Sequence, residues 1–249
     1  MSESLDRPID VPQLSPEEIQ ARVLHRDGLM LVIDKPAGLP VHRGPKGGPN
    51  LEASFDALRF GLPRPPVLAH RLDKDTSGCL VLGRHRKATA SLGLLFKHGR
   101  ISKTYWSVVE GGPAEDEGTI DMPLGRLNAE RGWWQKVDPE GQHAVTHWKV
   151  MGRGNGLTWL ALEPVTGRTH QLRVHAAAQG WPIVGDNIYG NGPRFGEPRL
   201  HLHSREIGIP ISRNKEPVRV TAPVPEHMRE RLKSCGWNEN DAERTAVAQ

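Results

Sequence analysis

The sequence predicts an α+β fold built on a central mixed, mostly antiparallel sheet that is flanked by helices and loops. Short segments rich in apolar and β-branched residues outnumber the segments with helical periodicity, and turn-forming residues separate several of them. Neither an internal repeat nor a low-complexity tract is found, so a repeat architecture is not indicated. With 249 residues, of which 37% are hydrophobic, the chain is long enough for one substantial core or two small domains.

The first elements are expected near residue 15. Residues 1–20 contain scattered acids and three prolines and are interpreted as a flexible acidic segment, whose Ser15–Glu18 end can cap a short helix. Val23–Leu24 and Leu29–Ile33 are predicted strands, and Arg26–Gly28 between them favours a hairpin turn.

The next stretch alternates loops with short elements. Residues 42–50 hold three glycines and two prolines and are predicted as a loop, while Leu51–Phe60 has helical spacing. Val67–Ala69 and Gly78–Gly83 are apolar and bracket the polar turn His70–Ser77. Because binding and catalytic residues concentrate on loops held by a scaffold, this turn is a candidate site.

The remaining predicted elements are a helix at Lys87–His98 and a strand at Ile101–Val109. Ala144–Met151 and Leu157–Leu162 are predicted to form a further antiparallel pair. Gln171–Gln179 is predicted to be helical, with Gly180 ending the helix.

Composition indicates one basic body between two acidic ends. The formal net charge is +4, but residues 1–20 carry −4 and residues 238–249 carry −2, which leaves +10 for residues 21–237. Such a body suits a polyanionic partner, although a basic, merely soluble surface is an equal alternative on charge alone. The folded domain is expected at residues 21–235, followed by a polar tail at residues 236–249.

The sequence favours a cytoplasmic protein. Its N-terminus has no apolar run behind a basic stretch, so neither a signal peptide nor a membrane span is predicted. Cys79 and Cys235 are the only cysteines, which is too few for a disulfide framework. No zinc-type spacing joins them or the histidines, so no metal site is predicted.

Three polar clusters stand out, at residues 70–78, 103–105 and 166–175. In an extended segment Asp73 and Asp75 would lie on one side, which would suit a pair of glycosidase carboxylates. Asp75 could equally cap a turn by accepting backbone hydrogen bonds. In the third cluster Arg168 precedes a helix start, where cations are disfavoured, so an anion is expected beside it.

These clusters resemble the signatures of the RluA-type pseudouridine synthases, a family that modifies ribosomal and transfer RNA. The matching segments are His70-Arg71-Leu72-Asp73-Lys74-Asp75-Thr76-Ser77-Gly78, Lys103-Thr104-Tyr105, Gly167 to His175, Pro182 to Asp186 with Tyr189-Gly190, Leu200 to His203, and Thr221-Ala222-Pro223. They run in the family's order over residues 22–225. One departure is Ser204, where the family usually has alanine. Only about twenty polar residues precede the body, so the chain resembles the short form of the family without an N-terminal S4-like RNA-binding domain.

The resemblance implies isomerisation of uridine to pseudouridine in structured RNA, in a ribosomal or transfer RNA stem-loop. It implies Asp73 as the nucleophile and Arg168 as the cation that orients it. Tyr105 is expected to stack on the flipped base and to help remove the C5 proton. The base leaves its stack at a cost of a few kcal/mol, and Arg71 is expected to enter the vacated space.

Further substrate contacts follow from the same resemblance. Leu172 is expected to pack against the held uracil. The residues expected to bind substrate, mostly its phosphates, are His70, His170, Arg173, Lys103, Lys35 and Arg43. No cofactor, no membrane and no obligate protein partner are implied, and the chain is expected to be a monomer.

Two other functions remain open from the sequence. Asp73 and Asp75 could serve a glycoside or nucleoside hydrolase, because such enzymes also attack a glycosidic bond. Alternatively, the chain could be a noncatalytic RNA-binding module in which Trp133 and Trp134 stack on bases. The same two tryptophans also fit simple packing within a hairpin.

Overall fold

The computed structural model of the chain describes residues 11–44, 47–128, 133–212 and 214–239. Its helices are α1 (Pro16–Gln20), the 3-10 helix η1 (Glu52–Leu58), α2 (Arg86–Lys97), α3 (Gln171–Ala178) and α4 (Glu226–Ser234). Its strands are β1 (Val23–Arg26), β2 (Met30–Lys35), β3 (Val67–Leu68), β4 (Ser77–Gly83), β5 (Ser102–Glu110), β6 (Glu117–Asp121), β7 (Leu124–Arg126), β8 (Gln135–Val137), β9 (Val145–Gly154), β10 (Leu157–Pro164), β11 (Leu202–Ile209) and β12 (Val218–Thr221).

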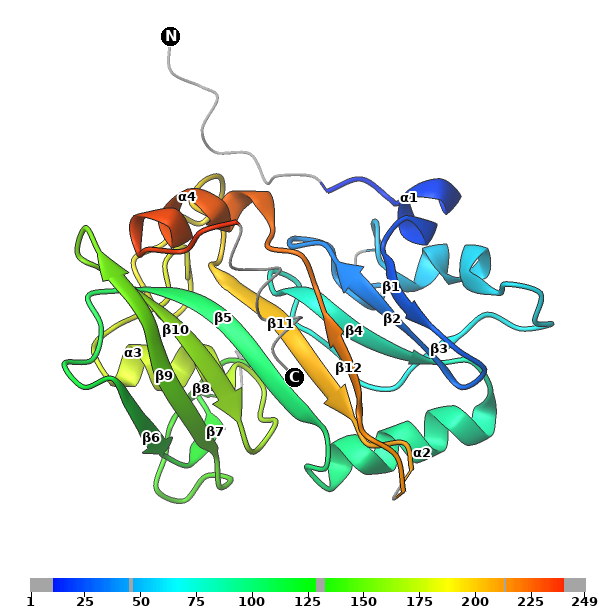
Figure 1. Ribbon diagram of the computed structural model, residues 1–249. Coiled ribbons are helices and arrows are strands. Elements are labelled where there is room, and N and C mark those ends of the chain that lie inside the picture. Colours follow the sequence, from blue (N-terminus) through cyan, green and yellow to red (C-terminus); the bar gives the residue numbers. More distant parts are fainter. Residues whose placement is uncertain (1–10, 45–46, 129–132, 213, 240–249) are drawn as a thin grey trace, which may run out of the picture.

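Among the described residues, ten strands form one twisted sheet across the molecule (Figure 1). The order is β1-β2-β4-β11-β5-β10-β9-β6, with β3 paired to β4 and β12 paired to β11. The β4–β11 pair is parallel and the other pairs are antiparallel. This confirms the predicted α+β class and the mixed, mostly antiparallel sheet. Strand β11 pairs with β4 on one side and β5 on the other, so it links the N-terminal strands to the strands from the middle of the chain.

Both faces of the sheet are covered by helices. Successive side chains in a strand point to opposite faces, so each strand contributes residues to the cores on both faces. In β2, Leu31 and Ile33 pack in the cluster that holds residues of α1 and η1, whereas Met30 and Val32 pack in the cluster that holds α2. On the other half of the sheet, α3 contributes to one cluster and α4 to another.

Strand β5 marks where these clusters meet. Trp106 and Val108 contribute to the cluster of α4, while Val109 packs in the cluster of α3. Tyr105 contacts both the cluster of α1 and η1 and the cluster of α3. Tyr105 therefore lies at the boundary between two cores on one face of the sheet, which is the place where side chains leave room for a pocket.

Two expectations about the N-terminal part need correction. The helix expected at residues 51–60 is a 3-10 helix, and Phe60 after it has a φ of 43°. The segment 1–20 was expected to be flexible up to a short helix at its end, yet Gln13, before that helix, donates to Asn50 O at 2.9 Å, and Ile19 within it is fully buried. The predicted Ser15–Glu18 cap is a complete capping box. Residues 1–10 lie outside the described part.

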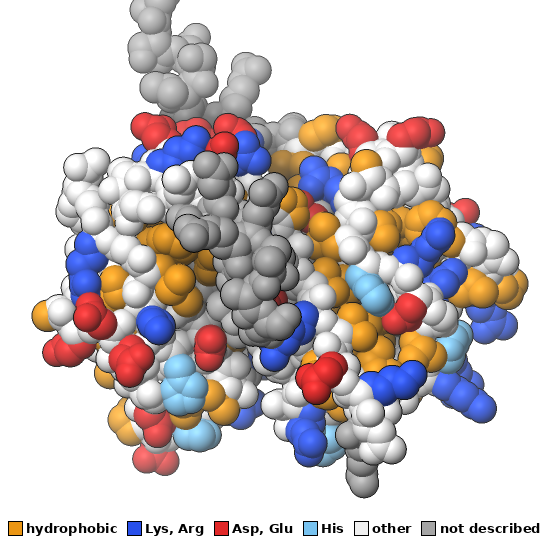
Figure 2. Space-filling model, in the orientation of Figure 1, with side chains coloured by type: hydrophobic (Ala, Val, Ile, Leu, Met, Phe, Trp, Pro, Cys, Tyr) orange, Lys and Arg blue, Asp and Glu red, His pale blue; other side chains and the backbone are white. Residues whose placement is uncertain are grey.

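At the other end, the expected polar tail 236–249 begins two residues too early. Trp237 is 6% exposed and packs with α4 in the core, because its ring buries a large apolar area. Residues 240–249 lie outside the described part. On the face shown in Figure 2, basic and acidic side chains are interspersed. No helix in the described part of the chain combines the length and the apolarity that crossing a bilayer requires.

Candidate active site

One cavity, of about 310 Å³, gathers the residues of the sequence clusters that the family resemblance assigned to catalysis or substrate binding, and Asp75 is not among them. The turn before β4, strand β5 and the start of α3 supply its walls. Its lining includes Asp73, Tyr105, Arg168, Arg71, Leu172, His70, Arg173 and Lys103. The residues come from three segments up to about a hundred positions apart, and β11 and β5 bring those segments together.

The turn that carries Asp73 is anchored by hydrogen bonds from the buried side chain of Lys35. This side chain is fully buried, and its Nζ donates to the carbonyl oxygens of Pro36, Lys74 and Thr76 at 2.9, 2.8 and 2.8 Å. Burial lowers the pKa of Lys35 to about 7, while the three nearby carboxylates of Asp75, Asp73 and Asp34 oppose that shift. The expectation that Lys35 contacts phosphates is therefore wrong, since Nζ is buried and donates to three backbone carbonyls.

His70 has a similar supporting role. Its Nε2 accepts a hydrogen bond from the Val81 backbone N–H at 3.0 Å, and its ring stacks on Phe96 with 4.1 Å between centroids. Burial, followed by the nearby charge of Lys103, lowers the pKa of His70 to about 3, so the ring is neutral. The neutral ring thus supports strand β4, and the expected contact of His70 with the substrate stays a prediction, since His70 also lines the cavity.

Asp73 faces His170 across the cavity. The Asp73 side chain is 25% exposed, and its Oδ2 lies 3.7 Å from His170 Nε2. His170 Nδ1 lies 2.8 Å from the hydroxyl of Tyr189, which accepts the Gln135 backbone N–H. The tautomer that satisfies both neighbours has Tyr189 donating to Nδ1 and the imidazole proton on Nε2, directed toward Asp73.

His170 was expected near the phosphates, but it is 7% exposed and sits at the N-cap of α3 with a φ of 55°. Burial lowers the pKa of His170 below its ordinary value, although Asp73 pulls in the opposite direction. A buried neutral imidazole beside Asp73 is better suited to orienting that carboxylate than to binding a phosphate.

Arg168 lies in the segment before α3, as predicted, with its backbone anchored by Gln171. Gln171 Oε1 accepts the Arg168 N–H at 3.0 Å and the Thr166 hydroxyl at 2.7 Å, while its Nε2 donates to Val145 O at 2.9 Å. The Arg168 side chain is exposed and its Nε donates to His143 O at 2.9 Å. The expected Arg168–Asp73 ion pair is thus not formed in this structure, although both residues line the cavity.

Arg173 is paired with the carboxylate of Asp186 and not with that of Asp73. It forms a two-pronged ion pair with Asp186, with Nε–Oδ2 and Nη2–Oδ1 distances of 2.8 and 2.6 Å. The two side chains are 3% and 1% exposed. Burial disfavours the Arg173 charge, but the bonds to Asp186 outweigh it and raise the pKa. Arg173 was expected to meet phosphates, and instead it holds the loop after α3 against the helix.

The other side chains are placed for contact with a ligand. Burial, with a smaller effect of Asp73, raises the pKa of the Tyr105 phenol, so it is protonated at neutral pH. Leu172 is 7% exposed at the cavity wall, and burial lowers the pKa of Lys103. Arg71 is exposed. The cavity therefore combines one carboxylate, an aromatic ring, an apolar wall and flexible cations.

The paired-carboxylate alternative loses support from the geometry. Asp75 lines neighbouring cavities and is absent from the lining of the one that contains Asp73. A hydrolase pair must flank one bond, so both carboxylates would have to face one site.

Trp133 is 57% exposed and meets His170 edge-on, with 5.3 Å between ring centroids. It therefore does more than fill a hairpin.

Comparison with known proteins assigns the family. The sequence model of the family described as RNA pseudouridylate synthase matches residues 29–178, which include all eight site residues. The chain belongs to this family. It is an RNA-modifying isomerase, and its resemblance to the RluA-type members is confirmed by the relatives.

Relatives in the family align over most of the chain. An uncharacterized RNA pseudouridine synthase of Zymomonas mobilis subsp. mobilis is 44% identical, over 82% of this chain and 94% of its own length. Ribosomal large subunit pseudouridine synthase D of Xanthomonas campestris pv. campestris is 38% identical, over 89% of this chain and 71% of its own. The solved structure of human RNA pseudouridylate synthase domain containing 4 superimposes with a TM-score of 0.73 at 26% identity, covering 88% of this chain and 95% of that one.

Sequence reasoning missed the residues that support this family's site here. Gln171, Tyr189 and Asp186 were not assigned to the site, although each lies in a segment that matched the family. The available signal was their density of hydrogen-bonding groups within those segments. Some of their partners lie outside these segments, as Val145 does for Gln171 and Gln135 for Tyr189, so only the fold shows what they hold.

Proposed function

We propose that this enzyme converts specific uridines of ribosomal or transfer RNA to pseudouridine, with Asp73 as the nucleophile. The observation that carries the proposal is the convergence of Asp73, Tyr105, Leu172 and the cations on one cavity. Ribosomal RNA is favoured by the name of the Xanthomonas relative, and transfer RNA remains the second candidate. A monomer in the cytoplasm, without membrane or protein partner, belongs to the same proposal and rests on the sequence.

The reaction breaks the bond from uracil N1 to ribose C1′ and joins C5 to the same carbon. Asp73 attacks either ribose C1′, which displaces N1, or uracil C6, after which the N1–C1′ bond breaks, and the base turns within the site. The bond to Asp73 breaks again when C5 displaces it from C1′ or, in the C6 route, after C5 has joined C1′. N1 then gains a proton and C5 loses one to solvent. No electron is gained or lost, so the reaction needs no redox partner.

The side chains around Asp73 divide the remaining tasks. Arg71 is exposed and flexible, and it fills the place of the uridine that has left the RNA stack. Leu172 and Tyr105 hold the uracil between an apolar wall and an aromatic ring. Because the Tyr105 phenol stays protonated, stacking and hydrogen-bond donation suit it better than removal of the C5 proton.

Arg168 completes the site when RNA binds. Its guanidinium exchanges the His143 carbonyl for the Asp73 carboxylate, a stronger acceptor because it is charged. Catalytic hydrogen bonds often form only in the complex, so we expect the Arg168–Asp73 pair to form when RNA is bound. His170 supports Asp73 from the opposite side.

The test is tritium release from RNA labelled at uridine C5, with ribosomal and transfer RNA fractions isolated from cells that lack this protein. Wild type is expected to release tritium from one fraction, and Asp73→Asn is expected to release none while melting at the same temperature. No release by wild type from either fraction would contradict the proposal.

The same assay separates the hydrolase alternative. Asp75→Asn is expected to retain most of the release, and no free uracil is expected to form. If Asp75→Asn lost activity as completely as Asp73→Asn and free uracil accumulated, two carboxylates would be acting on the glycosidic bond.

A further inference from the structure

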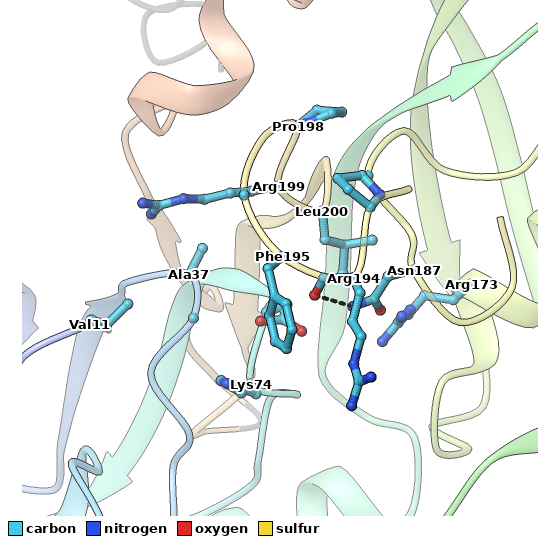
Figure 3. Close-up of a pocket in the computed structure, with 15 residues that line it drawn as sticks. Val11, Ala37, Lys74, Arg173, Asn187, Arg194, Phe195, Pro198, Arg199 and Leu200 are labelled. Carbon is cyan, nitrogen blue, oxygen red and sulfur yellow. Dashed lines mark hydrogen bonds between the residues drawn. The ribbon is translucent and has the colours of Figure 1, made fainter. Parts of the chain in front are cut away.

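A second cavity, of about 280 Å³, adjoins the candidate active site (Figure 3). It shares Arg173 with the first cavity, and its wall includes Lys74 and Asp75, which directly follow Asp73. Consecutive Cα atoms are about 3.8 Å apart, so this cavity begins one residue from the proposed nucleophile. Its volume is close to the lower limit, about 300 Å³, of typical small-ligand pockets.

An aromatic ring and cations line this second cavity. Figure 3 shows Phe195 reaching from its loop toward the space between Lys74 and Arg194. The Arg194 guanidinium carbon lies 5.2 Å from the centroid of the Phe195 ring. Asn187 Nδ2 donates to the Arg194 carbonyl at 3.4 Å and joins this loop to the segment after α3. The loop therefore presents a flat apolar surface with a positive charge beside it.

The cavity wall holds one carboxylate, that of Asp75, and four cations, of which two form ion pairs and two do not. Arg173 is buried in its ion pair with Asp186, and Arg199 Nε lies 3.1 Å from Glu197 Oε1. Lys74 and Arg194 are exposed and form no ion pair with any residue in the described part of the chain. Two exposed cations of the cavity wall are thus available to an anionic ligand.

We propose that this second cavity binds an unpaired nucleotide of the same RNA, next to the uridine that Asp73 attacks. Proteins recognise single-stranded bases by stacking them on aromatic rings and on arginine planes, which Phe195 and Arg194 supply together. Lys74 and Arg194 contact the phosphates that flank this base. The inference rests on the proposed function, because the RNA strand reaches this cavity only if its target uridine occupies the first one.

Stacking by Phe195 is tested by a series at one position. Phe195→Leu keeps apolar volume but removes the ring, and Phe195→Trp keeps a ring. In the RNA fraction that wild type modifies, Phe195→Leu is expected to raise KM by about five-fold or more, with the effect on KM rather than kcat. Phe195→Trp is expected to stay within about two-fold of wild type.

A matched control lies elsewhere on the surface. Phe60 also carries an arginine over its ring, since Arg26 lies 4.5 Å from the Phe60 centroid, and it belongs to neither cavity. Phe60→Leu is expected to leave KM unchanged. Equal KM values for Phe195→Leu, Phe60→Leu and wild type would overturn the proposed nucleotide site.

Binding without turnover provides a second measurement. In an Asp73→Asn background, Lys74→Gln and Arg194→Gln are each expected to reduce the slope of log Kd against log salt concentration by about one, because each removes one phosphate contact. Photo-crosslinking with 5-iodouridine-substituted RNA is expected to label the peptide that contains Phe195. Unchanged slopes together with crosslinks confined to other peptides would overturn the proposal.

The two proposals fail in different ways. If wild type turns over RNA while Phe195→Leu keeps a normal KM, only the second site is wrong. If wild type releases no tritium from any fraction, the proposed function is wrong. The salt slopes and the crosslinks of the RNA-bound protein then still decide whether the cavity binds a nucleotide.

Discussion

The loop that carries Asp73 and the segment that carries Arg168 are anchored by different kinds of buried side chain. Lys35 holds the first by donating to three carbonyls, whereas the neutral Gln171 holds the second by both accepting and donating. The Asp73 side chain already faces His170, but the Arg168 side chain remains exposed. On the proposed mechanism, we expect the Asp73 carboxylate to be in position before RNA binds and the Arg168 side chain to move toward it on binding.

The largest expected effect tests that movement. Arg168→Lys is expected to lower the rate of tritium release by about a hundred-fold or more, because an ammonium cannot present a planar fork to the carboxylate. Its melting temperature should stay near that of wild type, since the side chain is exposed. Arg153→Lys, at another exposed arginine that donates to backbone carbonyls, is the matched control and should keep its activity. Near wild-type turnover by Arg168→Lys would remove the proposed pairing.

A smaller effect should distinguish the two anchors. Lys35→Met is expected to lower the free energy of unfolding by about 3 kcal/mol, because three carbonyls lose their donor in a buried place. Gln171→Met removes four hydrogen bonds, but it is expected to cost about half as much, because bonds to a neutral amide are weaker than those of an ammonium. Urea denaturation measures both, with Lys97→Met as an exposed control. Equal losses for Lys35→Met and Lys97→Met would contradict the anchoring role.

The last effect is a pH dependence of stability near the charged anchor. Burial raises the pKa of Asp34 to about 6, against the attraction of Arg22 and Lys35. The folded protein therefore binds more protons than the unfolded chain between about pH 4 and pH 6, so this group makes stability fall as pH rises through that window. The expected decrease is on the order of 2 kcal/mol.

Asp34→Asn removes this titration. Its free energy of unfolding should match that of wild type near pH 4 and exceed it at pH 7, as measured by urea denaturation at both values. A constant difference across the window would show that Asp34 does not titrate in this way. The Gln171 anchor predicts no comparable pH dependence, because an amide does not ionise in this range.

Most of the fold on either side of the site could be predicted from local patterns. The hairpin of β1 and β2, the pair β9 and β10, and helices α2 and α3 were all expected near their observed places. Helix α4 was not expected, although Met228 and Leu232 have the i, i+4 spacing of a buried helical face. This pattern is short, and the helix it forms is buried by packing against Val108 and Trp159 of the sheet, which are distant in the sequence.

The site was easier to locate than to interpret. Its eight residues fall in one cavity, because family motifs keep chemistry-bearing side chains together. Their individual tasks depended on burial and on distant partners. Arg173 was interpreted as a phosphate contact, and the carboxylate that takes its charge lies thirteen residues later at Asp186. His70 depended in the same way on the Val81 N–H. Periodicity and charge do not reveal such pairings.

Strand β11 imposes an order on how the protein is made. It lies between β4 and β5, and it is synthesised after the strands that precede it in the chain. Domains form as the chain emerges from the ribosome, N-terminal part first. The turn carrying Asp73 and the strand carrying Tyr105 therefore cannot be joined through the sheet until residue 209 has emerged. The geometry that joins these two segments is therefore completed only after β11 has been synthesised, however early β4 and β5 emerge.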